Sequence, residues 1–221
     1  MKPASKRSLS NRSLVNGVGV NDSTYHTNII NNNKLIWRCP FYIKWKHMLE
    51  RCYSPKYHKN FPTYIGCSVC PEWRYFSKFR LWMENQNWKS MELDKDLLVK
   101  GNQVYGPDTC CFIPKPINYL FGSGKKKNNL HLPENVCLTA SGKYRVSVRI
   151  RPSKKYTKVF LTLKEAHIHA LEKKIEAVEY GIISYPELDV RAVIALNREI
   201  NQMQEQINNI QNSSPNLFDI P

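Results

Sequence analysis

Large apolar side chains recur every three or four residues in four long stretches of this chain, and this period predicts four helices. The stretches cover residues 36–52, 71–83, 163–180 and 187–211. The second stretch carries an aromatic stripe made of Trp73, Phe76, Phe79 and Trp82. Because these positions share one helical face, we expect the stripe to be buried, with Lys78 and Arg80 outside.

Alternating or continuous apolar runs, bounded by Gly, Asn and Pro, predict strands in the remaining sequence. They fall at residues 64–69, 91–99, 104–113, 135–138, 143–150 and 156–161. Lys100-Gly101-Asn102 predicts a turn that joins residues 91–99 to residues 104–113, a run broken at Gly106-Pro107. This hairpin leads into a short helix, so the expected fold is α+β. It comprises a ββα unit with flanking helices, then a three-stranded antiparallel sheet plus helix, and finally a C-terminal helix.

Segments without either period set the predicted boundaries of the domains. Residues 1–34, rich in Lys, Arg, Ser and Asn, predict a basic flexible arm. Residues 122–130 begin with GSGKKKNN, which is typical of a flexible basic linker. The linker separates a domain at residues 35–121 from one at residues 131–184. The C-terminal helix occupies residues 185–212, and residues 213–221 form a tail.

The charge balance indicates a polyanionic partner. The chain of 221 residues has 33 Lys and Arg against 18 Asp and Glu, a formal charge of +15, which favours nucleic acid over membrane. Residues 122–174 hold thirteen of the basic residues and three Glu. Arg145, Arg149 and Arg151 alternate with apolar residues along one predicted strand, so they are expected to share a face that can enter the major groove of double-stranded DNA. The alternative is a solvated basic sheet.

Other features concern compartment and membranes. No apolar run approaches the ~18 residues of a membrane span, and residues 1–13 lack the apolar core of a secretion signal. Seven Cys, an odd number, fit a reducing compartment. We therefore expect a cytoplasmic protein without a membrane partner.

Cys67 and Cys70 form a C-x-x-C pair, which is half of a zinc site. No second pair with suitable spacing follows, and small buried thiols are common at the end of a strand. We therefore expect no structural zinc.

The predicted hairpin carries the residues best suited to chemistry. Asp94 and Asp96 precede its turn, and Asn118 follows its second strand. A ββα unit can hold a divalent ion between acidic and amide oxygens beside a phosphodiester. A surface hairpin with solvated charges is the alternative interpretation.

Residues 37–120 resemble the phage form of the HNH endonuclease family, which includes homing endonucleases. The resemblance rests on these strings: W-x-x-M-x-x-R-C-Y from Trp45, P-T-Y-x-G-C-x-V-C-x-E-W from Pro62, F-x-x-F-x-x-W-M from Phe76, L-D-K-D from Leu93, the Gly101-Asn102 turn and Y-x-P-x-x-C from Tyr105. This resemblance implies a metal-dependent hydrolase that cleaves DNA phosphodiester bonds with Mg²⁺ or Mn²⁺.

The family's site residues transfer to this chain with two departures. By resemblance, the metal ligands are Asp94, Asn102 and Asn118. The catalytic set is Asp94, Lys95, Asp96 and Asn118. Lys95 stands where the family usually has its general-base His, and a lysine with an ordinary pKa near ~10.4 is protonated. Asp96 is therefore the nearest candidate base, although strand alternation places it on the same side as Asp94, where a second metal ligand is the alternative role. Thr109 stands where relatives often have Asn.

The following segment resembles the ethylene-response-factor (Apetala-type) DNA-binding domain. The matching strings are L-P-x-N-V from Leu132, S-G-K-Y-R-V-S-V from Ser141 and K-V-F-L-T-x-x-E-A from Lys158, with Asn135 in place of the usual Gly. The expected DNA-binding residues, combining the linker and the sheet, are Lys125, Lys126, Lys127, Lys143, Arg145, Arg149, Arg151, Lys154 and Lys155.

Two functions are compatible with these observations: an HNH endonuclease targeted to DNA by its C-terminal module, and a DNA-binding protein that kept the scaffold and lost its base. The C-terminal helix has a heptad seam formed by Val193, Leu196, Ile200, Met203, Ile207 and Ile210. Packing on its own domain is favoured over a weak homodimer. Leu217-Phe218 in the tail is a candidate docking motif for a replication protein.

Overall fold

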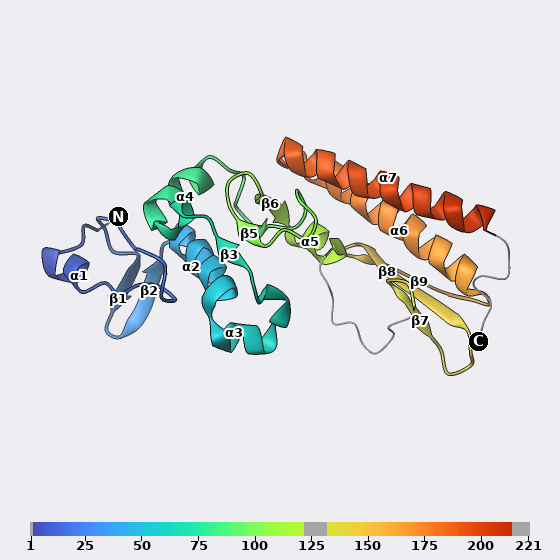
Figure 1. Ribbon diagram of the computed structural model, residues 1–221, viewed down its shortest axis with the longest axis horizontal. Helices are drawn as coiled ribbons and strands as arrows, with labels where there is room; N and C mark the ends of the chain where they lie inside the picture. The colour runs from blue at the N-terminus through green and yellow to red at the C-terminus, as the bar shows by residue number, and fades with distance from the viewer. Residues whose placement is uncertain (1, 122–131, 214–221) are drawn as a thin grey trace. The chain divides into compact units, whose positions relative to one another are not determined.

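The computed structural model describes residues 2–121 and 132–213. The chain forms two compact units, residues 1–112 and residues 113–221. Helices and short strands alternate in the first unit, and the second contains a three-stranded sheet with long helices (Figure 1). The predicted α+β class, the three-stranded sheet and the C-terminal helix are therefore confirmed. Among the described residues, no helix has the length and apolar character needed to cross a membrane.

The first unit contains short elements around an aromatic core. In chain order they are α1 (Lys6–Ser10), β1 (Asn28–Asn31), β2 (Lys34–Arg38), α2 (Pro40–Tyr53), α3 (Pro55–Asn60), the 3-10 turn η1 (Pro62–Tyr64), β3 (Ser68–Val69), the 3-10 turn η2 (Glu72–Arg74), α4 (Phe76–Glu84), β4 (Met91–Asp94) and β5 (Val104–Tyr105). Strand β6 (Cys111–Pro114) follows, and its four residues are buried.

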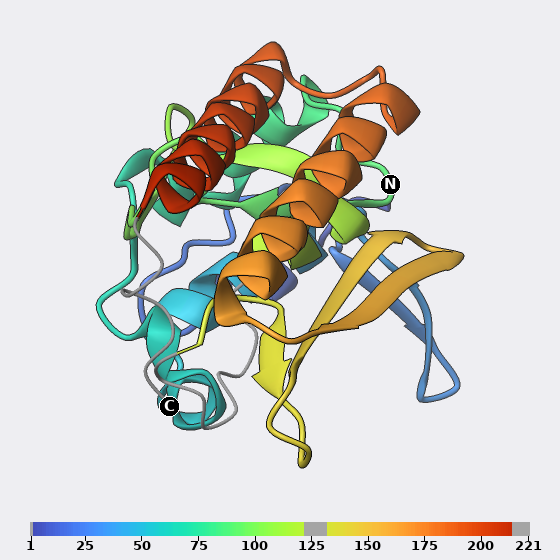
Figure 2. The same cartoon turned by 90° about the vertical axis from the view of Figure 1, so that its right-hand side faces the viewer.

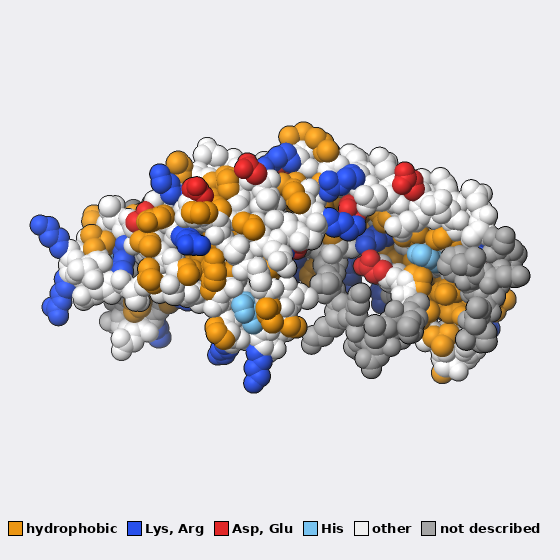
Figure 3. All heavy atoms as spheres, viewed as in Figure 1, with side chains coloured by type: hydrophobic (Ala, Val, Ile, Leu, Met, Phe, Trp, Pro, Cys, Tyr) orange, Lys and Arg blue, Asp and Glu red, His pale blue; other side chains and the backbone are white. Residues whose placement is uncertain are grey.

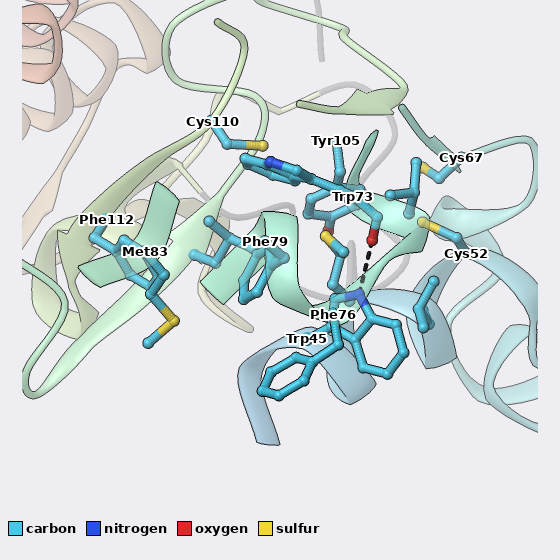
Figure 4. Packing of buried hydrophobic residues seen from close by; sticks show 14 of the residues in the cluster. Trp45, Cys52, Cys67, Trp73, Phe76, Phe79, Met83, Tyr105, Cys110 and Phe112 are labelled. Atoms are coloured by element: carbon cyan, nitrogen blue, oxygen red, sulfur yellow. Dashed lines mark hydrogen bonds between the residues drawn. The ribbon is translucent and has the colours of Figure 1, made fainter. Parts of the chain in front are cut away.

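Two tryptophans lie at the centre of this core. The indole nitrogen of Trp45 donates a hydrogen bond of 2.7 Å to the carbonyl oxygen of Trp73 (Figure 4). Trp73 also packs edge to face on Phe79, with ring centroids 5.1 Å apart. The predicted aromatic stripe is confirmed, since Trp73, Phe76 and Phe79 are buried and Trp82 packs against the same cluster.

The helix predicted from Ile36 begins later, at Pro40. Ile36 lies instead in β2, which pairs antiparallel with β1. Asn32 and Asn33 have φ angles of 47° and 58° and join these strands. Two left-handed residues form the type of tight turn that matches the twist of a hairpin, so the Asn pair was the sequence signal for these strands.

The strand predicted at residues 91–99 ends at Asp94. Its partner is β6, whereas β5 pairs in parallel with β3. The predicted order of strand, loop, strand and helix is present as β4, the loop with β5, β6 and α5. The predicted direct hairpin of residues 91–99 with residues 104–113 is wrong, because β4 pairs with β6 and not with β5. The chain leaves β4 because the Asp94 carboxylate accepts hydrogen bonds from the backbone of the following turn, a local alternative to strand pairing.

The N-terminal segment, expected to be a flexible arm at residues 1–34, contains α1, β1 and the start of β2 and belongs to the first unit. The Arg12 guanidinium donates hydrogen bonds to the carbonyl oxygens of Asn21, Ser23 and Tyr25 at 2.8, 2.5 and 2.9 Å. Val20 exchanges backbone hydrogen bonds with the chain around Arg74 and Phe76. The polar composition suggested disorder, but Arg12 satisfies three carbonyl groups of this segment, and backbone hydrogen bonds satisfy others.

Gly19 provides a test of this packing. A Cβ atom at Gly19 would lie only 2.3 Å from Leu49 Cδ1 and 2.9 Å from the Trp45 ring. We expect Gly19→Ala to lower the free energy of unfolding by about 1–3 kcal/mol, the usual cost of overpacking a core. Chemical denaturation would measure this, with Arg7→Ala in the exposed part of α1 as the control. Equal stability of the two variants would show that this segment does not pack on the core.

The second unit follows the sequence prediction closely. Its elements are α5 (Lys115–Phe121), β7 (Val136–Leu138), β8 (Tyr144–Arg151), β9 (Lys154–Phe160), α6 (Leu163–Ser184) and α7 (Val190–Asn212). The strands form an antiparallel sheet in the order β7-β8-β9, and α6 covers one face of it (Figure 2). The predicted linker at residues 122–130 and the tail motif at Leu217-Phe218 lie outside the described residues.

Helices α6 and α7 pack against each other along the second unit (Figure 1). Lys164 at the start of α6 donates to the carbonyl oxygens of Gln211 and Ser213 at 3.2 and 2.9 Å, so the two helices run antiparallel. The buried residues of the predicted seam are Leu196, Met203, Ile207 and Ile210. The seam thus packs within the chain, as favoured from the sequence, and the weak homodimer remains a prediction.

Candidate functional site

Asp94 stands at the end of β4 and organises the loop after it. Its Oδ1 atom accepts hydrogen bonds from the backbone N–H groups of Asp96 and Leu97 at 2.9 and 2.7 Å. Burial raises the pKa of the Asp94 carboxyl, and this effect exceeds the opposing effect of the two backbone bonds. Both bonds fall on Oδ1, so Oδ2 is the oxygen that can take an ion.

Lys95 is buried, with 7% of its surface exposed. Its ammonium group donates to Asp96 Oδ1 at 2.5 Å and to the carbonyl oxygen of Asn102 at 2.7 Å. Burial lowers the pKa of Lys95, but the hydrogen bond and charge of Asp96 outweigh burial and raise the pKa above 10.5. Lys95 is therefore a cation at neutral pH and cannot accept a proton from water.

Asp96 does not share a strand face with Asp94, because β4 ends at Asp94. This corrects the prediction from strand alternation. Asp96 instead pairs with Lys95, and its side chain is 55% exposed. Its predicted role as a base would therefore compete with this ion pair.

Asn102 closes the same loop. Its amide nitrogen donates to the carbonyl oxygens of Lys95 and Val104 at 2.9 and 2.8 Å, and its Oδ1 accepts from the Val104 N–H at 3.2 Å. Thr109 donates to the same Val104 carbonyl at 2.7 Å. These bonds give Asn102 a structural role, and its predicted role as a metal ligand would compete with them.

The residues of the first unit fit a metal ion only in part. No group of three or more His, Cys, Asp and Glu side chains suited to a metal occurs within residues 2–121 and 132–213. Asn118 lies on α5, in the second unit. Mg²⁺ is often bound by one or two carboxylates together with water and substrate phosphates. A single oxygen of Asp94 fits an ion that also has water or phosphate ligands better than an ion held by protein side chains alone.

The cysteines of the first unit behave as buried thiols. Cys52, Cys67 and Cys110 are 4% exposed or less. Burial raises the pKa of Cys52 and of Cys110 to about 12. Zinc binds the thiolate form, so these pKa values favour core packing for Cys52 and Cys110.

Replacing Lys95 tests its structural role. Lys95→Met keeps the length of the side chain but leaves the Asn102 carbonyl without its donor. We expect a loss of about 1–3 kcal/mol in the free energy of unfolding, the usual cost of a buried unsatisfied acceptor. Lys89→Met, at an exposed position before β4, is the control. Unchanged thermal stability of Lys95→Met would contradict this role.

The second unit presents a polar face on the side of the sheet away from α6. Along β8, Arg145, Ser147 and Arg149 alternate with buried Val146 and Val148. The register places Arg145 opposite Val159, Ser147 opposite Thr157 and Arg149 opposite Lys155 on β9. We call the residues of this side, Arg145, Ser147, Arg149, Lys155, Thr157 and Val159, the outer face. It combines three cations with two hydroxyl groups.

The pair Arg149 and Lys155 opposes the stability of the sheet. Like charges directly opposite each other on neighbouring antiparallel strands repel, at a cost on the order of 0.2–1 kcal/mol. The next pair in register, Arg151 and Lys154, repeats this arrangement, although Lys154 is also paired with Glu176 at 3.3 Å. A bound polyanion would relieve this repulsion.

Arg151 departs from the predicted face. The register shifts between Arg149 and Arg151, which marks a bulge. The Arg151 guanidinium lies over the ring of Tyr180 on α6, 5.4 Å from its centroid, on the side that the helix covers.

Lys143 stands at the exposed turn before β8, and Lys125, Lys126 and Lys127 lie outside the described residues. In Figure 3, Lys and Arg side chains in blue are spread over the face shown.

Comparison of the chain with models of protein families, with curated proteins and with solved structures gave no significant match. The two family resemblances therefore rest on the quoted motifs.

Proposed function

We propose that this protein is a DNA endonuclease of the HNH type that binds double-stranded DNA through the outer face of its second unit. The observation that carries the DNA-binding part is the like-charged pair Arg149 and Lys155. The pair costs stability in the free protein, and phosphate groups of a duplex would offset the repulsion. Ser147 and Thr157, which face each other between Arg145 and the Arg149–Lys155 pair, provide hydroxyl groups for base edges or phosphates.

The proposed hydrolytic site centres on Asp94. Its Oδ2 atom would hold Mg²⁺ or Mn²⁺ together with a DNA phosphate. The family resemblance also implies a ligand role for Asn118, which belongs to the second unit. The ion would stabilise negative charge that develops on the scissile phosphate. Lys95 holds the loop and remains protonated, so the water-activating group is Asp96 released from its ion pair, or a group supplied by the bound DNA.

A second candidate function is DNA binding without cleavage. The observation in its favour is the ion pair between Lys95 and Asp96, whose Nζ and Oδ1 atoms are 2.5 Å apart. It engages Lys95, which stands at the position of the family's general base, and Asp96, the nearest candidate to replace that base. On this alternative, the first unit kept the scaffold for stability alone.

Incubation of the full chain with supercoiled plasmid distinguishes these functions. We expect nicked plasmid with Mg²⁺ or Mn²⁺ and none with a chelator, whereas a gel shift should occur under both conditions. A gel shift without nicking across both metals and a range of pH favours the second candidate. Absence of a gel shift at low salt would reject both.

A further inference from the structure

A cavity of ≈ 710 Å³ lies within the second unit, between α5, the end of β8 and the C-terminal half of α6. Its volume is in the range of about 300–1,000 Å³ that is usual for small-molecule sites. Ile117 of α5 packs on Gly181 of α6 so closely that a Cβ atom there would lie 2.9 Å from Ile117 Cγ1. This contact fixes α5 against α6 and gives the cavity a defined wall.

The lining combines aromatic rings with cations. Tyr119 and Tyr180 contribute rings, and Tyr119 is 75% exposed. Each ring has a cation beside it, because Lys115 Nζ lies 6.0 Å from the Tyr119 centroid and Arg151 lies over Tyr180. The acidic side chain of the lining, Glu134, is paired with Lys174 at 2.7 Å. The chemistry is therefore aromatic and positively charged.

The cavity is continuous with the outer face. Arg149 and Lys155 belong to the outer face and also line the cavity. A DNA strand whose phosphates contact these two residues has its next nucleotide at the cavity. A paired base cannot leave its duplex without cost, whereas an unpaired base can turn out and stack on an aromatic ring.

We propose that this cavity receives one unpaired nucleotide of a DNA strand, with its base against Tyr119 and Tyr180 and its phosphate beside Arg149 and Lys155. The proposal rests on the proposed binding of DNA by the outer face and adds a substrate class to it, duplexes that contain an unpaired nucleotide. The aromatic rings supply stacking that is indifferent to base identity. Preference for such duplexes therefore depends on structure and not on sequence.

The experiment uses the full chain with a chelator and two short duplexes, one fully paired and one with a single unpaired 2-aminopurine. We expect the second duplex to bind roughly tenfold more tightly, with quenching of the 2-aminopurine fluorescence. Tyr180→Ala and Tyr119→Ala should remove the preference and the quenching. Tyr180→Phe, which keeps the ring, should retain both, and Tyr75→Ala at an exposed tyrosine of the first unit is the control.

Three outcomes separate the possibilities. Preference and quenching that both tyrosine-to-alanine variants lose support the proposal. Equal binding of the two duplexes, or a preference that neither alanine variant alters, overturns the cavity proposal and leaves DNA binding by the outer face intact. Failure of both duplexes to bind at low salt overturns the proposed function, and the cavity proposal with it.

Discussion

Asp94→Asn is expected to abolish metal-dependent nicking of plasmid DNA while gel-shift affinity for the same DNA is retained. Asn keeps an oxygen that can accept the backbone bonds from Asp96 and Leu97, so the loop is preserved. It lacks the anionic oxygen, and the loss of several kcal/mol of charge stabilisation corresponds to a rate lower by on the order of 10³-fold. Time courses of nicking with Mg²⁺ and Mn²⁺ would measure the loss.

The same variant is expected to be more stable than the unchanged protein in metal-free buffer at pH 7. The pKa of Asp94 is raised by burial, so the folded protein binds this proton more tightly than the unfolded chain does. Ionisation therefore opposes folding as pH rises from the unfolded pKa of 3.8 through the folded pKa. Below pH 3.8 the difference in stability between Asp94→Asn and the unchanged protein should disappear. Asp94 is then protonated in the folded and in the unfolded chain.

Thermal melts of both proteins across this range of pH supply the control for the nicking assay. A higher melting temperature for Asp94→Asn at pH 7 would show that loss of nicking is not loss of folding. It would also show that the carboxylate is kept at a cost to stability, as expected of a functional group. If Asp94→Asn nicks plasmid at the rate of the unchanged protein, Asp94 has no role in the reaction.

Replacing Arg145 and Arg149 together by Ala is expected to weaken duplex binding on the order of 10²-fold at low salt. Each phosphate contact releases about one counterion, so the slope of log affinity against log salt should flatten by roughly two units if both arginines contact phosphate. If they read base edges, preference among sequences should be lost as well. A salt titration by gel shift or fluorescence anisotropy measures slope and preference together.

The matched control removes the same charge elsewhere. Lys34 and Lys59 are exposed in the first unit, and their double replacement by Ala should leave the slope nearly unchanged. A control that weakens binding as much as the arginine pair would indicate that net charge, and not the outer face, governs binding. If the slope of log affinity against log salt stays steep in both double variants, the DNA-contacting surface must consist of other residues.

The second unit was predictable because its signals are local. Alternation along residues 143–150 and the helical period from Leu163 reflect burial on one sheet face and one helix face. The first unit depends on contacts that no short window contains. The indole nitrogen of Trp45 donates to the carbonyl oxygen of Trp73, 28 residues further along the chain, and the parallel pairing of β3 with β5 joins Ser68 to Val104 and Val69 to Tyr105.

The candidate site was predictable as a set of positions and not as a set of partners. The sequence identified Asp94, Lys95 and Asn102. Their hydrogen bonds depend on where β4 ends, which is at Asp94, after only four residues. Strand propensity favoured a longer element, and the side chain of Asp94 overrides it by accepting two backbone donors. A bulge likewise changes the face of Arg151, and no residue type marks that bulge unambiguously.

The like-charged pair of β8 and β9 makes ionic strength act in opposite directions on folding and on binding. Added salt screens the repulsion between Arg149 and Lys155 and so should raise the melting temperature of the free protein. On the proposed function, the same ions would compete with phosphate and lower the affinity for DNA. We therefore expect the salt concentrations that stabilise the free fold to be those that release bound DNA.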